Sequence, residues 1–416
     1  MLSTSVVLSE SMVNNMKTTL RKQIKNMTKT KRSAITLSVA VLSGLTTVLL
    51  LTAVFALPKA LEAESGTKSS NAVQVTDTSA SSGAAVKFQA TAAQPGSCPV
   101  AKRTVTSGDV SGLTNSGYAA GTQVYVPGGP DPWGGCFPNA SNTGVPAGTT
   151  LSAYTGSCSL GVDNTIIDSR TINCSLTITG SNVIIRNSKI VGDNIMVSSG
   201  SLSLTDSEVD FGSNINGESL KGSNITVTRA NLYGGKRQVW CNNCTLQDSY
   251  LHGQLRDDTG ITHLSAARVS QGSRYIHNTL LCDGPNVAPS AGCSANQTGY
   301  PDFEPVRDVT LEKNLYLATP SGYCSYGGGS PNKPYSDDPT NATYIKSINN
   351  VFQRGMNPND KSSIALTDKR RYTCGYYGVT VAFLSSKTGF QFTGNMWDDG
   401  FLFSNDTTYP YGGFYN

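Results

Sequence analysis

Short runs of alternating apolar and polar residues recur through much of the chain, and each run meets a polar residue at a similar place. Alternation with a period of two is typical of β-strands, whose successive side chains point to opposite faces. The polar residue is most often Asn or Asp, and Asn tolerates the left-handed backbone of tight turns. We assign the shared position to Asn187, Asp206, Arg229, Asp248, Asn278, Asn314, Asn350 and Asn395.

The spacing of this position predicts coils of chain stacked on one another. Successive gaps are 19, 23, 19, 30, 36, 36 and 45 residues, and a coil of three short strands with turns needs about 20 residues. The longer gaps therefore contain inserted loops or further rungs. Because one coil cannot bury its own apolar side chains, stacking would bury a continuous column of Val, Ile and Leu. The pattern predicts an all-β solenoid of parallel strands over 151–416, with a β-sandwich as the alternative.

A different pattern precedes the coils. Residues 34–57 form an uncharged apolar run of 24 residues behind seven basic residues in 1–33. About 20 apolar residues suffice to cross a bilayer, and the basic flank predicts a cytoplasmic N-terminus with everything after the run outside the cell. We expect a cytoplasmic basic tail and a transmembrane helix that anchors the protein to the cell membrane. Small residues such as Ala56 leave cleavage and secretion open, and a buried core helix is the alternative.

Two segments separate this run from the coils. Residues 58–97 are rich in Ser, Ala and Thr, and they offer too little apolar surface to offset the entropy lost on ordering. We expect a disordered stalk there and an N-terminal cap region at 98–150.

Charge and cysteine content support export. Without the basic tail and its one acidic residue, the chain keeps 25 basic and 27 acidic residues, a net charge of −2, so nucleic acid is not an expected partner. All ten cysteines follow Gly96, and an even number in an exported domain predicts disulfides. Cys241 and Cys244 have strand-like flanks, which favour a disulfide over a zinc or redox motif. Cys282 and Cys293 flank one loop, so we expect them to pair.

Several segments resemble the right-handed parallel β-helix proteins of the pectate-lyase-like superfamily, and a group of exported bacterial β-helix proteins in particular. The resemblance covers roughly 133–402. It is carried by FPNASNTGVPAGTTLSAYTG (137–156), TIIDSRTINCSLTITGSNVIIRNSKIVG (165–192), SYLH and HNTL around the histidines, TGYPDFEPVRDVTLEKNLY (298–316) and NMWDDG (395–400). It implies a right-handed parallel β-helix with long C-terminal loops, in a superfamily that includes polysaccharide lyases and glycoside hydrolases.

The chain differs from related sequences at the acidic residues that their catalytic and calcium-binding motifs contain. A His-Thr-Asp-Gly motif of related chains reads His263-Leu264-Ser265-Ala266 here, so its acid is replaced by Ser265. Calcium is the cation that the resemblance would bring, but no clear cluster of aspartates near an arginine is present. The three close aspartates typical of polygalacturonases are also absent.

The stretch from Ser249 to Cys282 contains the chain's three histidines, including His277, which we expect to cap a turn. Histidine titrates near neutral pH, and paired carboxylates can act as acid and base. We therefore predict that any catalytic groove is built from His252, Asp257, Asp258, His263 and Arg268. Arg268 would hold a uronate carboxylate with paired hydrogen bonds. A solvated turn at the two aspartates, and structural roles for the histidines, are the alternatives.

Aromatic residues on or near the β-runs could stack against sugars, or pack under the C-terminal loops instead: Tyr233, Trp240, Tyr250, Tyr275 and Tyr316. Two functions follow. We favour a non-catalytic surface protein that binds cell-surface or environmental polysaccharide, because the expected acidic residues are missing. A polysaccharide lyase or glycoside hydrolase is the alternative.

Overall fold

A computed structural model describes residues 72–76, 84–88, 98–107, 119–215, 220–319, 321–353, 374–375 and 378–403. The chain forms two compact units, Met1–Thr91 and Ala92–Asn416. In the first unit, β1 (Ala72–Thr76) pairs antiparallel with β2 (Ala84–Phe88), so two paired strands lie inside the stretch expected to be a disordered stalk. The predicted transmembrane run at 34–57 lies outside the described residues. Within those residues, no helix has the length and apolar character needed to span a bilayer.

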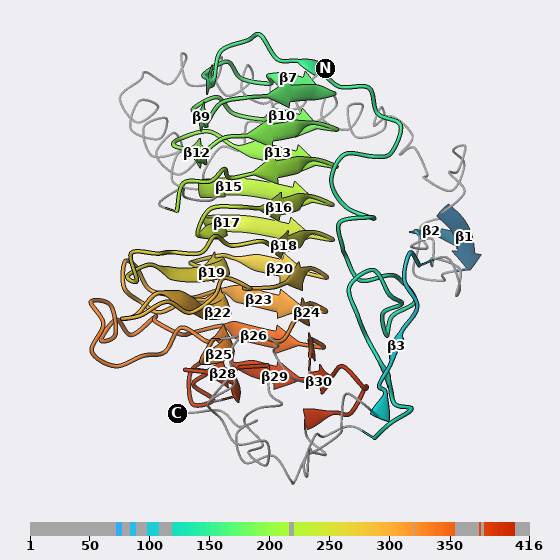
Figure 1. Cartoon of the computed structure of the whole chain (residues 1–416), viewed down its shortest axis with the longest axis vertical. Helices are drawn as coiled ribbons and strands as arrows, with labels where there is room; N and C mark the ends of the chain where they lie inside the picture. The colour runs from blue at the N-terminus through green and yellow to red at the C-terminus, as the bar shows by residue number, and fades with distance from the viewer. Residues whose placement is uncertain are drawn as a thin grey trace, which may run out of the picture. The chain divides into compact units, whose positions relative to one another are not determined.

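In the second unit, short parallel strands stack rung upon rung from β7 to β29 (Figure 1). The described residues include one ten-stranded ladder: β5 (Ser152–Ala153), β8 (Arg170–Ile172), β11 (Lys189–Val191), β14 (Glu208–Asp210), β16 (Asn231–Tyr233), β18 (Tyr250–His252), β21 (Thr279–Leu280), β24 (Leu315–Tyr316), β27 (Val351–Phe352) and β30 (Met396–Trp397).

The other large sheet contains two ladders that merge through two long strands, β15 and β17. One ladder comprises β6 (Ser159–Leu160), β9 (Leu176–Ile178), β12 (Ile195–Val197), β15 (Leu220–Thr228), β17 (Arg237–Gln247), β19 (His263–Val269), β22 (Gly292–Thr298), β25 (Tyr323–Tyr326) and β28 (Gly378–Val381). The other adds β7 (Ile166–Asp168), β10 (Val183–Arg186), β13 (Leu202–Thr205), β20 (Arg274–Ile276), β23 (Val309–Glu312), β26 (Ile345–Ile348) and β29 (Gln391–Thr393).

The register of these strands confirms the parallel stacking that the sequence predicted. β10 pairs in parallel with β7 before it and with β13 after it, and β11 does the same between β8 and β14. Each strand thus meets its equivalent from the next coil, not its neighbour along the chain. The alternative of a β-sandwich is therefore wrong.

Inward side chains form a column that runs through the coils. In one ladder Ile167, Ile185, Leu204, Val227 and Leu246 are partners in successive strands, and each is at most 3% exposed. Burying a side chain of this size contributes about 1.5–3 kcal/mol relative to leaving it exposed. Because each coil supplies only a few such residues, the column is stable only when neighbouring coils cover it.

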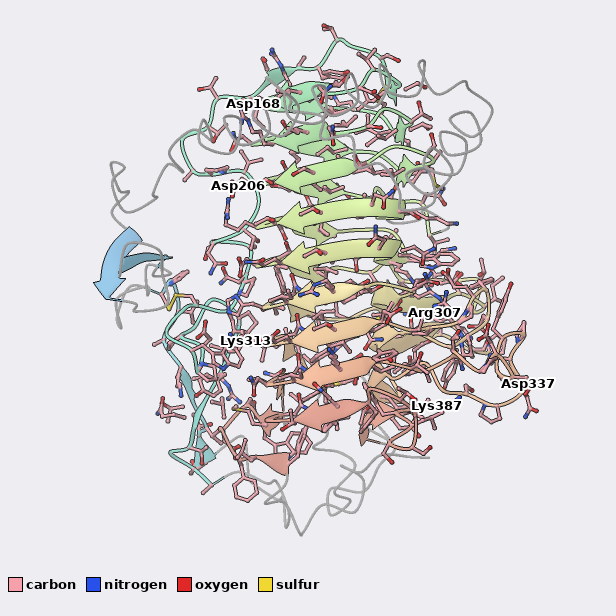
Figure 2. All side chains as sticks on the ribbon, turned by 180° about the vertical axis from the view of Figure 1, so that it is seen from behind. Asp168, Asp206, Arg307, Lys313, Asp337 and Lys387 are labelled. Atoms are coloured by element: carbon pink, nitrogen blue, oxygen red, sulfur yellow. A yellow bond between two sulfur atoms is a disulfide. The ribbon has the colours of Figure 1, made fainter. Side chains whose placement is uncertain are left out.

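The shared polar position of the sequence is two adjacent positions in the structure. Asn187, Asp206, Arg229 and Asp248 have positive φ angles of 49–52° and form a corner of the coil; Asp206 is labelled in Figure 2. In the later coils this corner is taken by His277, Lys313 and Asn349, with φ of 53–56°. The Asn residues assigned there lie one residue further on and point inward. The predicted register is therefore wrong by one residue in the later coils.

The inward position holds a ladder of buried amides. Asn278, Asn314, Asn350 and Asn395 are each at most 3% exposed. The backbone N–H and the side-chain amide of each of the first three donate to the side-chain oxygen of the next, at 2.9–3.0 Å. These bonds give buried polar groups the partners they need.

A strap, residues 119–150, runs across the ten-stranded ladder. The Tyr125 N–H donates to the Asp398 carbonyl at 2.7 Å, and the Gly144 N–H donates to the Arg229 carbonyl at 2.9 Å. Between these points Phe137 is fully buried in a cluster with Leu315 and Val351. Near its start, β4 (Gln123–Val124) pairs with β3 (Arg103–Thr104). The predicted cap region therefore lies, where it is described, along the side of the coils.

All ten cysteines form disulfides, as expected for an exported domain, and Cys282 and Cys293 bond to each other as predicted. The five pairs are Cys98–Cys136, Cys158–Cys174, Cys241–Cys244, Cys282–Cys293 and Cys324–Cys374.

Candidate functional site

Asp257 and Asp258, predicted as a carboxylate pair, have different environments. The Asp257 carboxylate is buried and accepts backbone N–H bonds from Thr259, Ile261 and Thr262 at 2.7–3.1 Å. The Thr259 hydroxyl, together with the backbone donors, holds the pKa of Asp257 below its usual range. Asp258 is exposed and pairs with Arg256. Asp257 therefore organises its loop. Asp258 fits the alternative of a solvated turn better than it fits a catalytic pair.

His252 ends β18 with a half-buried ring stacked on two tyrosines. Its ring centroid lies 4.0 Å from that of Tyr250 and 5.7 Å from that of Tyr233. Its Nε2 lies 2.9 Å from Oδ1 of Asn231, an acceptor, so Nε2 carries the proton and Nδ1 is free of it. Burial lowers the pKa of His252 to about 4. The ring is therefore neutral near pH 7, as a general base must be.

His263 and Arg268 stand at opposite ends of β19. The His263 side chain is exposed, and its backbone is in register with Gly292. Arg268 is 9% exposed. Within the described residues, no hydrogen bond, ion pair or ring contact joins any two of the five predicted site residues. The contacts of the structure therefore do not assemble them into one catalytic group.

Arg268 belongs instead to a surface centred on Trp240. Lys221 Nζ lies 4.4 Å from the centre of the Trp240 ring, and the guanidinium carbons of Arg237 and Arg268 lie 5.7 and 5.5 Å from it. The Phe303 ring lies 5.1 Å from the Trp240 ring and 5.0 Å from the Arg268 guanidinium. We call these five residues the Trp240 platform. Lys221, Trp240 and Arg268 are direct partners in β15, β17 and β19, so they occupy one position in three successive rungs.

Polar contacts hold the platform in place. The Arg268 guanidinium donates to the Tyr300 carbonyl at 2.7 Å and to the Asp302 carboxylate at 2.8 Å, and Lys333 also pairs with Asp302 at 2.9 Å. Burial alone would raise the pKa of Asp302, but the hydrogen bonds from Arg268 and Lys333 outweigh it and lower the pKa. The indole N–H of Trp240 donates to Ser270 at 3.1 Å. The ring and the arginine are therefore fixed before any ligand arrives.

A second cluster, which sequence reasoning missed, surrounds His277. Nδ1 of His277 lies 2.7 Å from Asp248 on the preceding coil, and Nε2 lies 2.9 Å from Asp131 on the strap. Trp133 and Phe137 of the strap pack against the same ring. Burial alone would lower the pKa of His277, but hydrogen bonds and charge from Asp131 and Asp248 raise it to about 9. His277 is therefore a cation at neutral pH that ties the strap to the coils.

The sequence carried part of the signal for this cluster. The sequence predicted that His277 caps a turn beside the shared polar position. In the structure His277 occupies the corner of the coil that follows the coil of Asp248. Asp131 is 146 residues away from His277, and no repeat links the two.

Comparisons with family models, curated proteins and solved structures found no match to this chain. Within the described residues, no three His, Cys, Asp or Glu side chains gather in a way that could hold a metal ion.

Proposed function

We propose that this protein is an exported right-handed parallel β-helix protein, of the pectate-lyase-like kind that its sequence resembles, that binds an acidic polysaccharide. The Trp240 platform is the proposed binding surface. The proposal places the coils outside the cell, held at the membrane by residues 34–57 or released after cleavage. Five disulfides support an oxidising compartment.

Cationic side chains from three adjacent strands surround the Trp240 indole ring, and this arrangement is the basis for the proposed ligand. The apolar face of a sugar ring stacks on an indole, while carboxylates along the polymer are attracted to the surrounding cations. Arginine matches a carboxylate with its planar fork of donors. An aromatic ring among basic groups therefore suits a sugar that carries negative charge better than a neutral sugar.

The rungs also suggest how the polymer lies. Lys221, Trp240 and Arg268 are one rung apart, and neighbouring strands are spaced by about 4.8 Å. A chain that runs along the stack would meet the Lys221 ammonium group and then the Trp240 ring, while Arg268, held by Asp302, supports the ring from the next rung. Binding is proposed in preference to turnover because the buried contacts of Asp257 and Arg268 are structural ones.

The test compares a polygalacturonate with the same polymer after full methyl esterification, which removes the charge and keeps the sugar. We expect the purified protein to bind the acidic polymer at least about tenfold more tightly, a difference of about 1.4 kcal/mol. The affinity should fall as salt is raised, because salt screens exposed charges. Equal affinity for the two polymers, measured by calorimetry, would exclude charge as the basis of recognition.

A further inference from the structure

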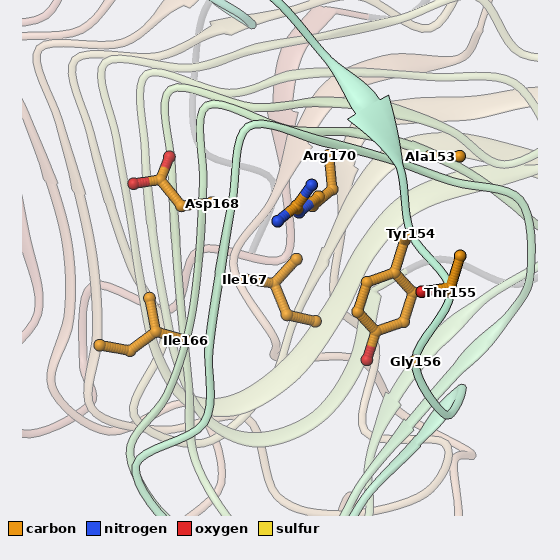
Figure 3. Close-up of a pocket in the computed structure, with 8 residues that line it drawn as sticks. All are labelled: Ala153, Tyr154, Thr155, Gly156, Ile166, Ile167, Asp168 and Arg170. Atoms are coloured by element: carbon orange, nitrogen blue, oxygen red, sulfur yellow. The ribbon is translucent and has the colours of Figure 1, made fainter.

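The first coil carries a cavity of about 360 Å³ (Figure 3), and none of its lining residues belongs to the Trp240 platform. It is lined by side chains of β7 and β8 and by the segment that follows β5. β5 and β7 are the first strands of their ladders, so no earlier rung covers this end within the described residues. Ligand pockets commonly have volumes of about 300–1,000 Å³, which makes this cavity large enough for a compact molecule.

The cavity has an apolar side. Ile167 is 3% exposed and belongs to the core, whereas its neighbour Ile166 is 59% exposed. The Tyr154 ring packs against the same core, and its hydroxyl donates to the Ser157 carbonyl at 3.0 Å. Gly156 lets the ring lie there, since an added Cβ would come within 2.6 Å of the Tyr154 ring. The ring therefore forms a fixed wall beside exposed apolar surface.

The cavity also has a cationic side. The Arg170 guanidinium donates to the Ser152 hydroxyl, and no carboxylate of the described residues forms an ion pair with it. Asp168 also lines the cavity, but its carboxylate accepts hydrogen bonds from Arg186, Asn187 and Ser169 at 2.8–2.9 Å. In Figure 3 the Asp168 carboxylate points away from Arg170. A single positive charge thus faces an apolar wall.

We propose that this cavity binds a small monocarboxylate with a compact apolar body. The carboxylate accepts paired hydrogen bonds from the Arg170 guanidinium, and the apolar body lies between the Tyr154 ring and Ile167. A dianion is disfavoured because the Asp168 carboxylate lies on the same rim. This site does not depend on polysaccharide binding at the Trp240 platform.

Phenylacetate and its neutral amide, phenylacetamide, are a matched pair of probes with the same apolar body. Titration into the full chain in detergent, followed by calorimetry, should give saturable binding of phenylacetate and at least about tenfold weaker binding of the amide. Arg170→Gln should reduce phenylacetate affinity to that of the amide. Arg274→Gln is the control, since Arg274 is an exposed arginine on β20, outside this cavity.

Three results would overturn the site: no saturable binding of phenylacetate, equal affinities for the acid and the amide, or unchanged phenylacetate affinity in Arg170→Gln. Melting curves of both variants show whether the coils remain folded. Arg170 is exposed and lies on the first coil, so a melting temperature equal to that of Arg274→Gln is expected.

Discussion

The corner residue of each coil adopts a left-handed backbone that residues other than glycine rarely take. At His277, with φ of 53°, this geometry is stabilised by contacts that an ordinary turn lacks. The ring lies between Asp248 of the coil and Asp131 of the strap, and the Asp131 side chain is only 3% exposed. One residue thus fixes both the corner and the strap that crosses it.

Replacing His277 with Gln should lower the free energy of unfolding at pH 6 by about 3 kcal/mol, because a buried carboxylate loses its cation. The pKa of His277 is raised to about 9 in the folded protein, from about 6.5 in an unfolded chain. Its contribution to stability is therefore complete below pH 6.5 and is lost as the pH rises through 9. Denaturant unfolding at a series of pH values measures both effects.

The control for this prediction is His263→Gln, which changes an exposed histidine. The wild type and this control should both lose stability between pH 7 and 9.5, whereas His277→Gln should lose less over that range. Parallel pH profiles for wild type and His277→Gln would contradict the role assigned to the ring.

At the scale of the elements, the ladder of buried amides joins the later coils. Asn314 accepts from the backbone and side chain of Asn278 and donates to Asn350 and to the Tyr275 carbonyl. Three earlier coils have serine at this position (Ser188, Ser207 and Ser249) and one has Ala230, and there the Ser188 N–H donates to the Ser207 hydroxyl. A serine hydroxyl and an asparagine amide therefore both accept the backbone N–H of the neighbouring coil, but the amide forms more hydrogen bonds.

This difference predicts a graded loss of stability. Asn314→Ser keeps a hydroxyl acceptor for the Asn278 N–H and should cost about 1 kcal/mol, whereas Asn314→Ala leaves buried donors unpaired and should cost about 3 kcal/mol. The free energy of unfolding in denaturant is the measurement. If the two variants were equally stable, the ladder would not act through hydrogen bonding.

The alternation of apolar and polar residues predicted the strands, because inward and outward side chains must alternate along each of them, and the spacing of the shared polar position predicted their parallel stacking. It was not enough to fix the register at the corner. Asn suits both the left-handed corner, as at Asn187, and the inward ladder, as at Asn278. Two adjacent positions with one preferred residue type cannot be separated by pattern alone.

Across the whole molecule, the five predicted site residues have different partners, and those of Arg268 come from an inserted loop. Arg268 was expected to take part in binding, but its partners Asp302 and Phe303 come from a loop more than 30 residues later. Contacts between a rung and a distant loop follow no period in the sequence. The rung partners Lys221 and Trp240 do follow the coil spacing, so the sequence repeat could have predicted that these two residues are neighbours.

The affinity of Trp240→Ala for polygalacturonate tests whether the Trp240 platform binds an acidic polysaccharide. Loss of the ring removes the stacking surface and separates the cations around it, so the affinity should fall by about tenfold, or about 1.4 kcal/mol. Tyr344→Ala, which removes an aromatic ring that is 48% exposed outside the platform, should bind as the wild type does. Wild-type affinity in Trp240→Ala, with an unchanged melting temperature, would show that the platform is not the binding surface.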